Sequence, residues 1–259
     1  MAATGKNPGL SGGMYPFPWI EDGDIDIPSA FIKDVEGERM LRLVGAEATL
    51  EMEAERIPAK GNNVIATKGG GSGQRLVVCA HIDSKEGTPG ALDNAGGVAV
   101  LMLLADLLRD WHGGLEVELV AFNGEDTYSA VGQVLYLQRN AGRLEDILLA
   151  VNLDGAGYRE GRTAYSLYEC SEELSKPIRQ AFSGHAGMYE GEQWYQSDHM
   201  IFVQNGRPAV AITCEQFDYL STHISHTIKD APELVDSGKL AEAALALRDL
   251  VLRLEKTLG

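Results

Sequence analysis

Histidine and acidic side chains follow several apolar stretches of this 259-residue chain. His81 and Asp83 come directly after the run Leu-Val-Val-Cys-Ala, and Asp93 follows a loop that contains glycine and proline. Imidazole and carboxylate groups at the end of a buried strand are the materials of a zinc site. For Asp93 taken alone, capping of the helix that follows is an equally good interpretation. The combination of these residues indicates a metal site.

Two further apolar stretches end in the same way. Residues 115–122 are followed by Asn-Gly-Glu125-Asp126, and residues 147–153 are followed by Asp154. A histidine, His226, lies in a late loop. A single acid after a strand is normally a cap or turn residue, but acids and histidines at three strand ends rarely arise from capping alone. The candidate site residues are therefore His81, Asp83, Asp93, Glu125, Asp126, Asp154 and His226.

Amide hydrolysis is a reaction that such a set can support. Zinc lowers the pKa of bound water to about 7, and two zinc ions can share the resulting hydroxide while one polarises the scissile carbonyl. A carboxylate that does not bind metal must take the proton of the water and pass it to the leaving amine. Glu125 and Asp126 point in opposite directions in an extended segment, so one can bind metal while the other faces the water.

The elements that must position these residues alternate between apolar strands and helices. This alternation predicts an α/β fold, with a mostly parallel, twisted central sheet and helices on both of its faces. The carboxyl ends of the strands, where the candidates lie, are where open α/β sheets place their sites. Strands are predicted at 27–32, 46–57, 62–66, 76–80, 115–122, 147–154, 162–168 and 208–213, and helices at 36–44, 98–109, 131–138, 172–182 and 239–258.

Composition and charge limit the possible partners. The formal net charge of −16 argues against binding to nucleic acid or to an anionic membrane. No run approaches the roughly 18 apolar residues that a membrane span needs. The first residues lack the apolar core of a secretory signal, so a cytoplasmic protein is expected unless a longer precursor carries a signal. Cys79, Cys170 and Cys214 are widely spaced and do not form a disulfide framework.

Six short motifs resemble those of the family-28 metallopeptidases, the di-zinc aminopeptidases and carboxypeptidases of clan MH. They occur in the order and rough spacing of that family, and the resemblance covers about residues 62–259. It implies the phosphorylase/hydrolase-like fold of zinc exopeptidases. The motifs are His81-Ile-Asp83, Leu92-Asp-Asn-Ala-Gly-Gly97, Asn123-Gly-Glu-Asp126, Asn152-Leu-Asp-Gly155, Ser197-Asp-His199 and Ser225-His-Thr-Ile-Lys-Asp230.

The resemblance implies a role for each candidate. Two zinc ions are expected per chain: one held by His81, Asp93 and Asp154, and a second held by Asp126, His226 and the bridging Asp93. The family pattern also implies a cis peptide bond between Asp93 and Asn94.

Two catalytic assignments follow from the same resemblance. Asp83 would orient His81 through its other ring nitrogen, and Glu125 would be the general base.

The chain departs from the family pattern at two positions. The second acid is commonly glutamate, whereas Asp126 is shorter, so that metal would sit differently. Many members have a tyrosine directly before the last ligand histidine to bind the oxyanion, and Ser225 stands there. Tyr219, Tyr195 or zinc itself could substitute for that tyrosine.

The remaining histidines are less suited to bind metal. His223 lies close to His226, but the Thr227 and Asp230 that follow favour His226 as the ligand. The other three are expected at the surface or behind the ligands, namely His112, His185 and His199.

Residues 1–61 resemble the tail of a protease-associated domain whose front half is missing, followed by a peptidase domain at 62–259. Such a remnant would cap the catalytic domain and leave open sheet edges. Because open edges invite a partner strand, a homodimer is a possible assembly.

The favoured function is a zinc exopeptidase, an aminopeptidase that acts on a peptide substrate and recognises its free amine through Glu125 and Asp154.

A glutaminyl-cyclase-like acyltransferase with one zinc is an alternative that Asp83-Ser-Lys supports slightly, although five ligands argue for two metals. Carboxypeptidase activity is a third option, without an obvious basic cluster to bind a substrate carboxylate. A non-catalytic, receptor-like relative is a fourth, but such relatives typically lose ligands, and every ligand position is filled here.

Overall fold

A seven-stranded sheet organises the computed structural model, which describes residues 2–3, 12–14, 26–53, 55, 57–127 and 130–258. The strand order is β4-β6-β5-β7-β10-β8-β9. β6, β5, β7 and β10 run parallel to one another, and β8 runs parallel to β9. β4 pairs with β6, and β8 with β10, in antiparallel fashion. The predicted mostly parallel sheet is therefore confirmed. The strands are β4 Val64–Gly69, β5 Arg75–His81, β6 Glu116–Phe122, β7 Ile147–Leu153, β8 Thr163–Tyr168, β9 Met188–Glu190 and β10 Ala209–Cys214.

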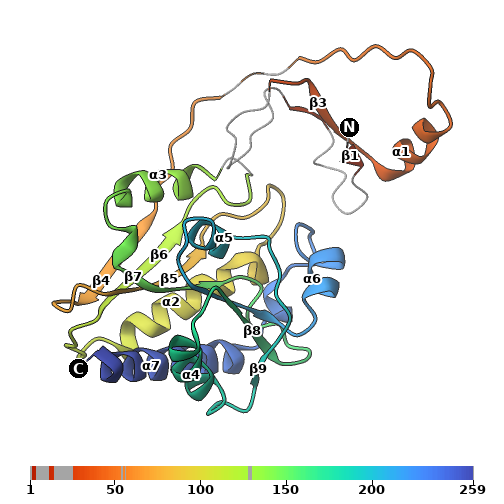
Figure 1. Cartoon of the computed structure of the whole chain (residues 1–259). Helices are drawn as coiled ribbons and strands as arrows, with labels where there is room; N and C mark the ends of the chain where they lie inside the picture. Colours follow the sequence, from red (N-terminus) through yellow and green to blue (C-terminus); the bar gives the residue numbers. More distant parts are fainter. Residues whose placement is uncertain are drawn as a thin grey trace.

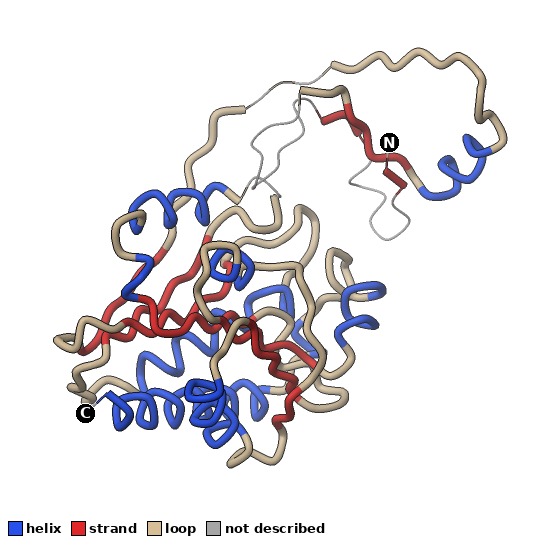
Figure 2. Tube along the Cα trace, in the orientation of Figure 1, coloured by secondary structure: helices blue, strands red, loops and turns tan. Residues whose placement is uncertain are grey.

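Helices cover both faces of this sheet, as predicted (Figures 1 and 2). α2, α4 and α7 pack on one face, and α3 and α5 pack on the other. Among the described residues, no helix is both long and apolar enough to cross a membrane. The helices are α2 Gly96–Leu107, α3 Val131–Asn140, α4 Glu172–Phe182, α5 His199–Val203, α6 Phe217–His223 and α7 Ser237–Leu258.

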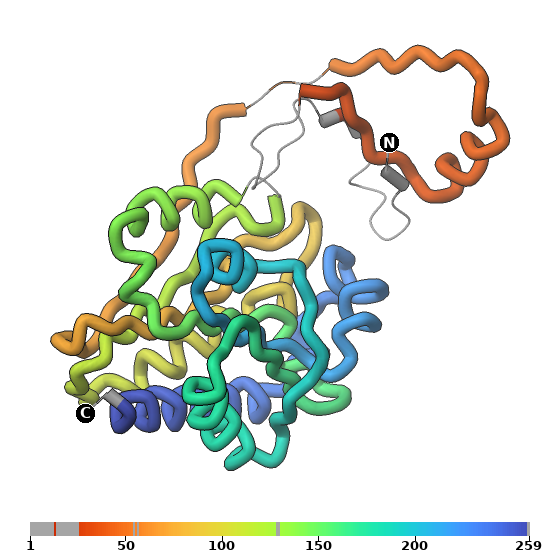
Figure 3. The backbone as a smooth tube through the Cα atoms, in the orientation of Figure 1, coloured from red at the N-terminus to blue at the C-terminus, as the bar shows by residue number. Residues whose placement is uncertain are grey.

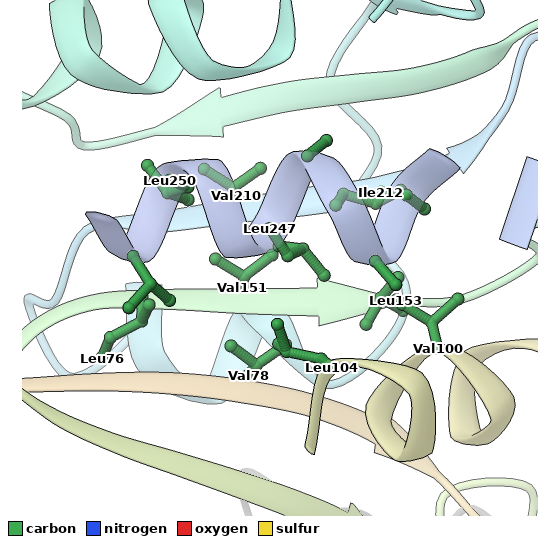
Figure 4. Close-up of a cluster of buried hydrophobic side chains, with 14 of the residues drawn as sticks. Leu76, Val78, Val100, Leu104, Val151, Leu153, Val210, Ile212, Leu247 and Leu250 are labelled. Carbon is green, nitrogen blue, oxygen red and sulfur yellow. The ribbon is translucent and has the colours of Figure 1, made fainter. Parts of the chain in front are cut away.

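The core follows from the alternation of side chains along the central strands. All of β5 is buried, which explains why its sequence is a continuous apolar run. Leu76 and Val78 face the layer of α2 and α7, whereas Val77 and Cys79 face the layer of α3 and α5. Figure 4 shows Leu76, Val78 and Leu247 in the cluster of buried side chains on the face of the sheet that α2 and α7 cover.

The strand predicted at 46–57 is wrong for its described residues, which form neither strand nor helix. In the sequence, Ala48, Leu50 and Met52 alternate with polar residues, which is the pattern behind the predicted strand, yet Leu50 is 48% exposed. An alternating pattern supplies an apolar face, but a strand also needs a neighbouring strand to take its hydrogen bonds. The sheet edge next in the chain is β4, which pairs with β6 instead.

Two short helices replace segments that the sequence suggests are loop or turn. α5 follows Asp198, and α6 lies between the predicted strand 208–213 and the predicted helix 239–258. With five and seven residues, both are too short for the hydrophobic period to reveal them.

The N-terminal segment contains a small three-stranded sheet of order β1-β3-β2. Its elements are β1 Ala2–Ala3, β2 Gly12–Met14, β3 Ser29–Ile32 and α1 Asp34–Leu41. β3 and α1 agree with the strand and helix predicted there, and Figure 3 follows the chain from this segment towards β4. Residues 1, 4–11 and 15–25 lie outside the described part of the chain, and the resemblance to a protease-associated domain stays a prediction.

Candidate metal centre

Three neighbouring parallel strands deliver the first part of the centre. The order β6-β5-β7 places the carboxyl ends of these strands side by side. His81 is the last residue of β5, Asp126 follows β6, and Asp154 directly follows β7. Because the strands run parallel, these side chains meet at one edge of the sheet.

Two loops complete the centre. Asp93 lies in the segment Ala91–Ala95, ahead of α2, and His226 lies in the loop after α6. α2 begins at Gly96 with no side-chain cap on its N-cap residue, so Asp93 does not serve as the cap. Capping of the following helix, the alternative interpretation of Asp93, therefore does not account for this carboxylate.

Asp93 lies between the two histidines. Its Oδ1 is 3.1 Å from His81 Nε2, and its Oδ2 is 3.2 Å from His226 Nε2. On the two sides, Asp154 Oδ1 is 3.8 Å from His81 Nε2 and Asp126 Oδ1 is 2.8 Å from His226 Nε2. The five residues thus form two half-sites, each with one imidazole and one carboxylate, that share Asp93.

Backbone and side-chain hydrogen bonds hold Asp93 in this position. The buried carboxylate of Asp230 accepts hydrogen bonds from the amides of Leu92 at 2.7 Å and Asp93 at 3.1 Å. The Asn94 side chain donates to the carbonyl of Leu153 at 2.7 Å. The peptide bond between Asp93 and Asn94 is cis, as the family resemblance implies.

Asp83 supports the centre differently from the expected contact. His81 Nδ1 is 3.0 Å from the backbone carbonyl of Asp83, whereas the Asp83 carboxylate is 3.9 Å away from the same nitrogen. A carbonyl oxygen only accepts, so Nδ1 carries the proton and Nε2 is free to bind a metal. The carboxylate instead accepts hydrogen bonds from the amides of Gly124, Glu125 and Asp126, at 2.8, 3.3 and 3.1 Å.

Lys85 adds a contact that the sequence did not suggest. Its buried Nζ donates to the backbone carbonyl of Asp126. Burial lowers the pKa of this ammonium, and the nearby carboxylates of Asp126 and Glu125 oppose that shift. Together, Asp83 and Lys85 tie the loop after β6 to the loop after β5.

The electrostatics of the centre favour a bound cation. Burial alone would lower the pKa of both histidines, but the adjacent carboxylates raise the pKa of His81 well above its usual range and that of His226 to about 9. Burial would raise the pKa of Asp93, yet its hydrogen bonds with the histidines leave it lowered overall. His81 Nε2 and Asp126 Oδ2 are buried and have no hydrogen-bond partner of good geometry within the described chain.

These donors fit zinc. His81, Asp93 and Asp126 each offer a ligand atom, and these atoms lie within 4.8 Å of one another. Imidazole nitrogen and carboxylate oxygen are both common zinc ligands. A divalent cation would neutralise carboxylates that otherwise repel one another at this distance.

Glu125 borders the two half-sites. Its Oε2 is 4.0 Å from His81 Nε2, and its side chain is 25% exposed, more than that of Asp93 or Asp126. Burial raises the pKa of this carboxyl well above its usual range, and the neighbouring carboxylates of Asp198 and Asp154 add to the rise while His81 opposes it. A carboxyl with a raised pKa is suited to exchange protons near neutrality.

Asp198 lies behind this group and was not among the sequence candidates, although it belongs to one of the six motifs. It is 2% exposed and accepts a hydrogen bond from the side chain of Gln133, a residue of α3. Burial raises its pKa to about 7. Only the tertiary fold reveals its burial, because an acid that precedes a short helix normally reads as a turn residue.

The other histidines lie away from the two half-sites. His112 is exposed, and His185 pairs with Asp249 at 3.1 Å. His223 is exposed at the end of α6 and packs against the ring of Tyr219. His199 is fully buried rather than at the surface, and its Nε2 lies 2.9 Å from the carbonyl of Trp194.

The candidates for oxyanion binding differ in exposure. Ser225, directly before His226, is buried, whereas Tyr195 and Tyr219 are 61% and 50% exposed. Tyr195 donates its hydroxyl hydrogen to Gln193.

Comparisons with known proteins give a family match and several structures of similar fold. Residues 63–251 match the family described as Peptidase family M28. A comparison with curated protein sequences gives no match.

Solved structures of similar fold include two aminopeptidases. The aminopeptidase from Aneurinibacillus sp. strain AM-1 has a TM-score of 0.71 and 23% identity, with 87% of this chain and 57% of that one covered. The zinc aminopeptidase BSAP from Bacillus subtilis has a TM-score of 0.67 and 22% identity, with coverage of 89% and 58%. This chain therefore spans less than three-fifths of either protein. A glutaminyl cyclase from an Acidobacteriales bacterium has a TM-score of 0.64 and 21% identity, with coverage of 76% and 74%.

Proposed function

This chain belongs to peptidase family M28, and we propose that it is an aminopeptidase that holds two zinc ions and hydrolyses the N-terminal peptide bond of its substrate. The observation that carries the proposal is the position of Asp93, whose two carboxylate oxygens each face a different histidine at 3.1 and 3.2 Å. A carboxylate whose two oxygens face different histidines is suited to bridge two cations.

Each zinc would have three protein ligands. His81, Asp93 and Asp154 would hold one ion, and Asp93, Asp126 and His226 would hold the other. The orientation of His81 through the Asp83 carbonyl supports this assignment, because it directs Nε2 towards the carboxylates. Lys85 and Asp83 each form a hydrogen bond with the backbone of Asp126 and thereby hold its loop in place.

Zinc supplies an acidified water and polarises the scissile carbonyl when it is bound. Glu125 would accept a proton from that water and deliver it to the leaving amine. The raised pKa of the Glu125 carboxyl supports this role. Glu125 and Asp154 are also the carboxylates that would bind the ammonium group of the substrate.

A glutaminyl cyclase is the second candidate function. The similar structure from the Acidobacteriales bacterium is covered over 74% of its length, more than either aminopeptidase, and favours this alternative. The two half-sites around Asp93 favour two metals instead of one. A peptide with N-terminal glutamine separates the two reactions: an aminopeptidase releases free glutamine, whereas a cyclase releases ammonia and leaves the peptide backbone intact.

One experiment tests the proposal directly. The full chain is assayed for metal content by atomic emission and for cleavage of a panel of amino-acid anilides, before chelation, after chelation and after zinc is restored. We expect about two zinc ions per chain, and cleavage that is lost on chelation and recovered with zinc. Folded, zinc-loaded protein that cleaves no anilide and processes no glutaminyl peptide would indicate a non-catalytic binding protein.

A further inference from the structure

The described part of the chain contains a pocket of about 1080 Å³. Its lining comes mainly from residues 189–196, which follow β8, and residues 213–219, which lead from β10 into α6. None of the five candidate zinc ligands lines it.

Thr213 connects this pocket to the metal centre. The residue lines the pocket and follows Ile212, whose carbonyl accepts a hydrogen bond from the amide of Asp154 at 2.9 Å. Gly155, which follows Asp154, packs so closely against Thr213 that a Cβ at position 155 would lie 2.9 Å from Thr213 Oγ1. The pocket therefore begins next to the loop that holds Asp154, a candidate zinc ligand. A substrate side chain beside the scissile bond would be located there.

Aromatic rings form much of the pocket wall. They belong to Tyr189, Trp194, Tyr195, Phe217 and Tyr219. Trp194 and Phe217 pack against each other with ring centroids 4.5 Å apart. Such a wall suits the methylene stem of a long side chain, and aromatic faces also attract a cation.

Four carboxylates line the pocket, and two of them are already neutralised. Glu190 accepts two hydrogen bonds from the guanidinium of Arg179, at 2.7 and 2.9 Å. Glu215 accepts hydrogen bonds from the backbone amide and the guanidinium of Arg162, at 2.9 and 3.0 Å.

The other two carboxylates, Glu192 and Asp218, are exposed at the pocket. Within the described part of the chain, neither carboxylate makes an ion pair, and the pocket lining includes no lysine, arginine or histidine. The pocket therefore has two uncompensated negative charges over an aromatic wall.

We propose that this pocket receives the side chain of the substrate's N-terminal residue and selects lysine or arginine through Glu192 and Asp218. The inference rests on the proposed aminopeptidase function and adds the substrate class. The stem of the side chain would pack on the aromatic wall, and its cationic end would lie between the two unpaired carboxylates. Acidic N-terminal residues would be repelled by the same charges.

Turnover tests this selectivity with a matched substrate pair. Lysyl and norleucyl p-nitroanilides differ chiefly in the terminal charge, and we expect the zinc-loaded full chain to show a kcat/KM for lysyl at least about tenfold above norleucyl. Glu192→Gln and Asp218→Asn should each lower the lysyl-to-norleucyl ratio about 3- to 10-fold. Glu145→Gln removes an exposed carboxylate outside the pocket and should leave the ratio unchanged.

Binding without turnover separates this inference from the proposed function. Calorimetry with L-lysinol and L-norleucinol, which have no bond to cleave, should give tighter binding of lysinol and loss of that difference in Asp218→Asn. Selective binding without anilide cleavage would retain the pocket assignment and reject the aminopeptidase. Cleavage that favours norleucyl would reject the pocket assignment alone, and the absence of both selectivity and cleavage would reject both.

Discussion

Asp93 and Glu125 are both carboxylates at the same centre, yet their surroundings give them different roles. Asp93 is held by backbone contacts between two imidazoles, whereas Glu125 is more exposed and borders the half-sites. We expect Asp93→Ala to lose bound zinc. Glu125→Gln should retain zinc and lose about 10²- to 10⁴-fold in kcat, because the amide cannot accept the proton. Metal analysis and anilide kinetics on the same samples check both, and appreciable turnover in Glu125→Gln would show that another residue is the base.

His199 gives the molecule a pH-dependent contribution to stability that is separate from the ligand histidines. Burial lowers its pKa to about 4. In the unfolded chain this histidine has a pKa of about 6.5, so between pH 4 and pH 6.5 the unfolded chain binds more protons than the folded one. The contribution of His199 to folding stability is therefore fully present above pH 6.5 and is lost as the pH falls towards 4.

This contribution is isolated by subtracting the unfolding free energy of the His199→Gln variant from that of the wild type. This difference should fall by up to about 3 kcal/mol between pH 7.5 and pH 4. Guanidinium unfolding of metal-free protein measures it, and parallel pH curves for the two proteins would contradict the buried neutral imidazole.

At the scale of single residues, the sequence indicates the candidate ligands but not the groups that hold them in place. The candidate ligands could be identified because acids and histidines follow apolar runs. The contacts of Lys85 with Asp126 and of Asp230 with Asp93 join residues 41 and 137 positions apart. No local pattern encodes such contacts. The Asp83 carboxylate likewise accepts hydrogen bonds from amides 41 to 43 positions away, and the Asp83 carbonyl contacts His81 instead.

Among the elements, the buried strands and α7 were the most predictable. β5 has every residue buried, and the expected apolar face of α7 lies in the core. A continuous apolar run and a helical period are strong signals because many residues repeat them. The segment 46–57 shows the limit, since alternation cannot report whether a neighbouring strand is present.

The apolar face of α7 is tested with two leucines of the same helix. Leu247 is fully buried, whereas Leu252 is 40% exposed. Leu247→Ala should lower the unfolding free energy by about 2–5 kcal/mol through lost burial and the remaining cavity. Leu252→Ala should cost much less, and equal losses in denaturant titrations would mean that α7 packs differently.

For the whole molecule, zinc should act as a stabilising ligand. Five carboxyl and imidazole side chains converge on one centre, and a ligand that binds only the folded state stabilises it by mass action. Free zinc at about 100 times its dissociation constant adds about 2.7 kcal/mol, which raises the melting temperature by about 5–10 °C. Scanning calorimetry with zinc and with a chelator measures the shift. Asp93→Ala should show almost none of it, and an equal shift in that variant would place the stabilising metal elsewhere.

The possible homodimer stays a prediction. β4 lies at the sheet edge and exposes Val64 and Ile65, at 58% and 41%. Sedimentation at micromolar concentration is the relevant measurement.

The spacing of the ligands along the chain has a consequence for biosynthesis. His81 and His226 stand near opposite ends of the peptidase region, and the helix that completes its core follows the second of them. A ribosome must therefore release most of the matched region 63–251 before both half-sites exist. On the proposed function, capture of both metal ions would then be a late step of folding.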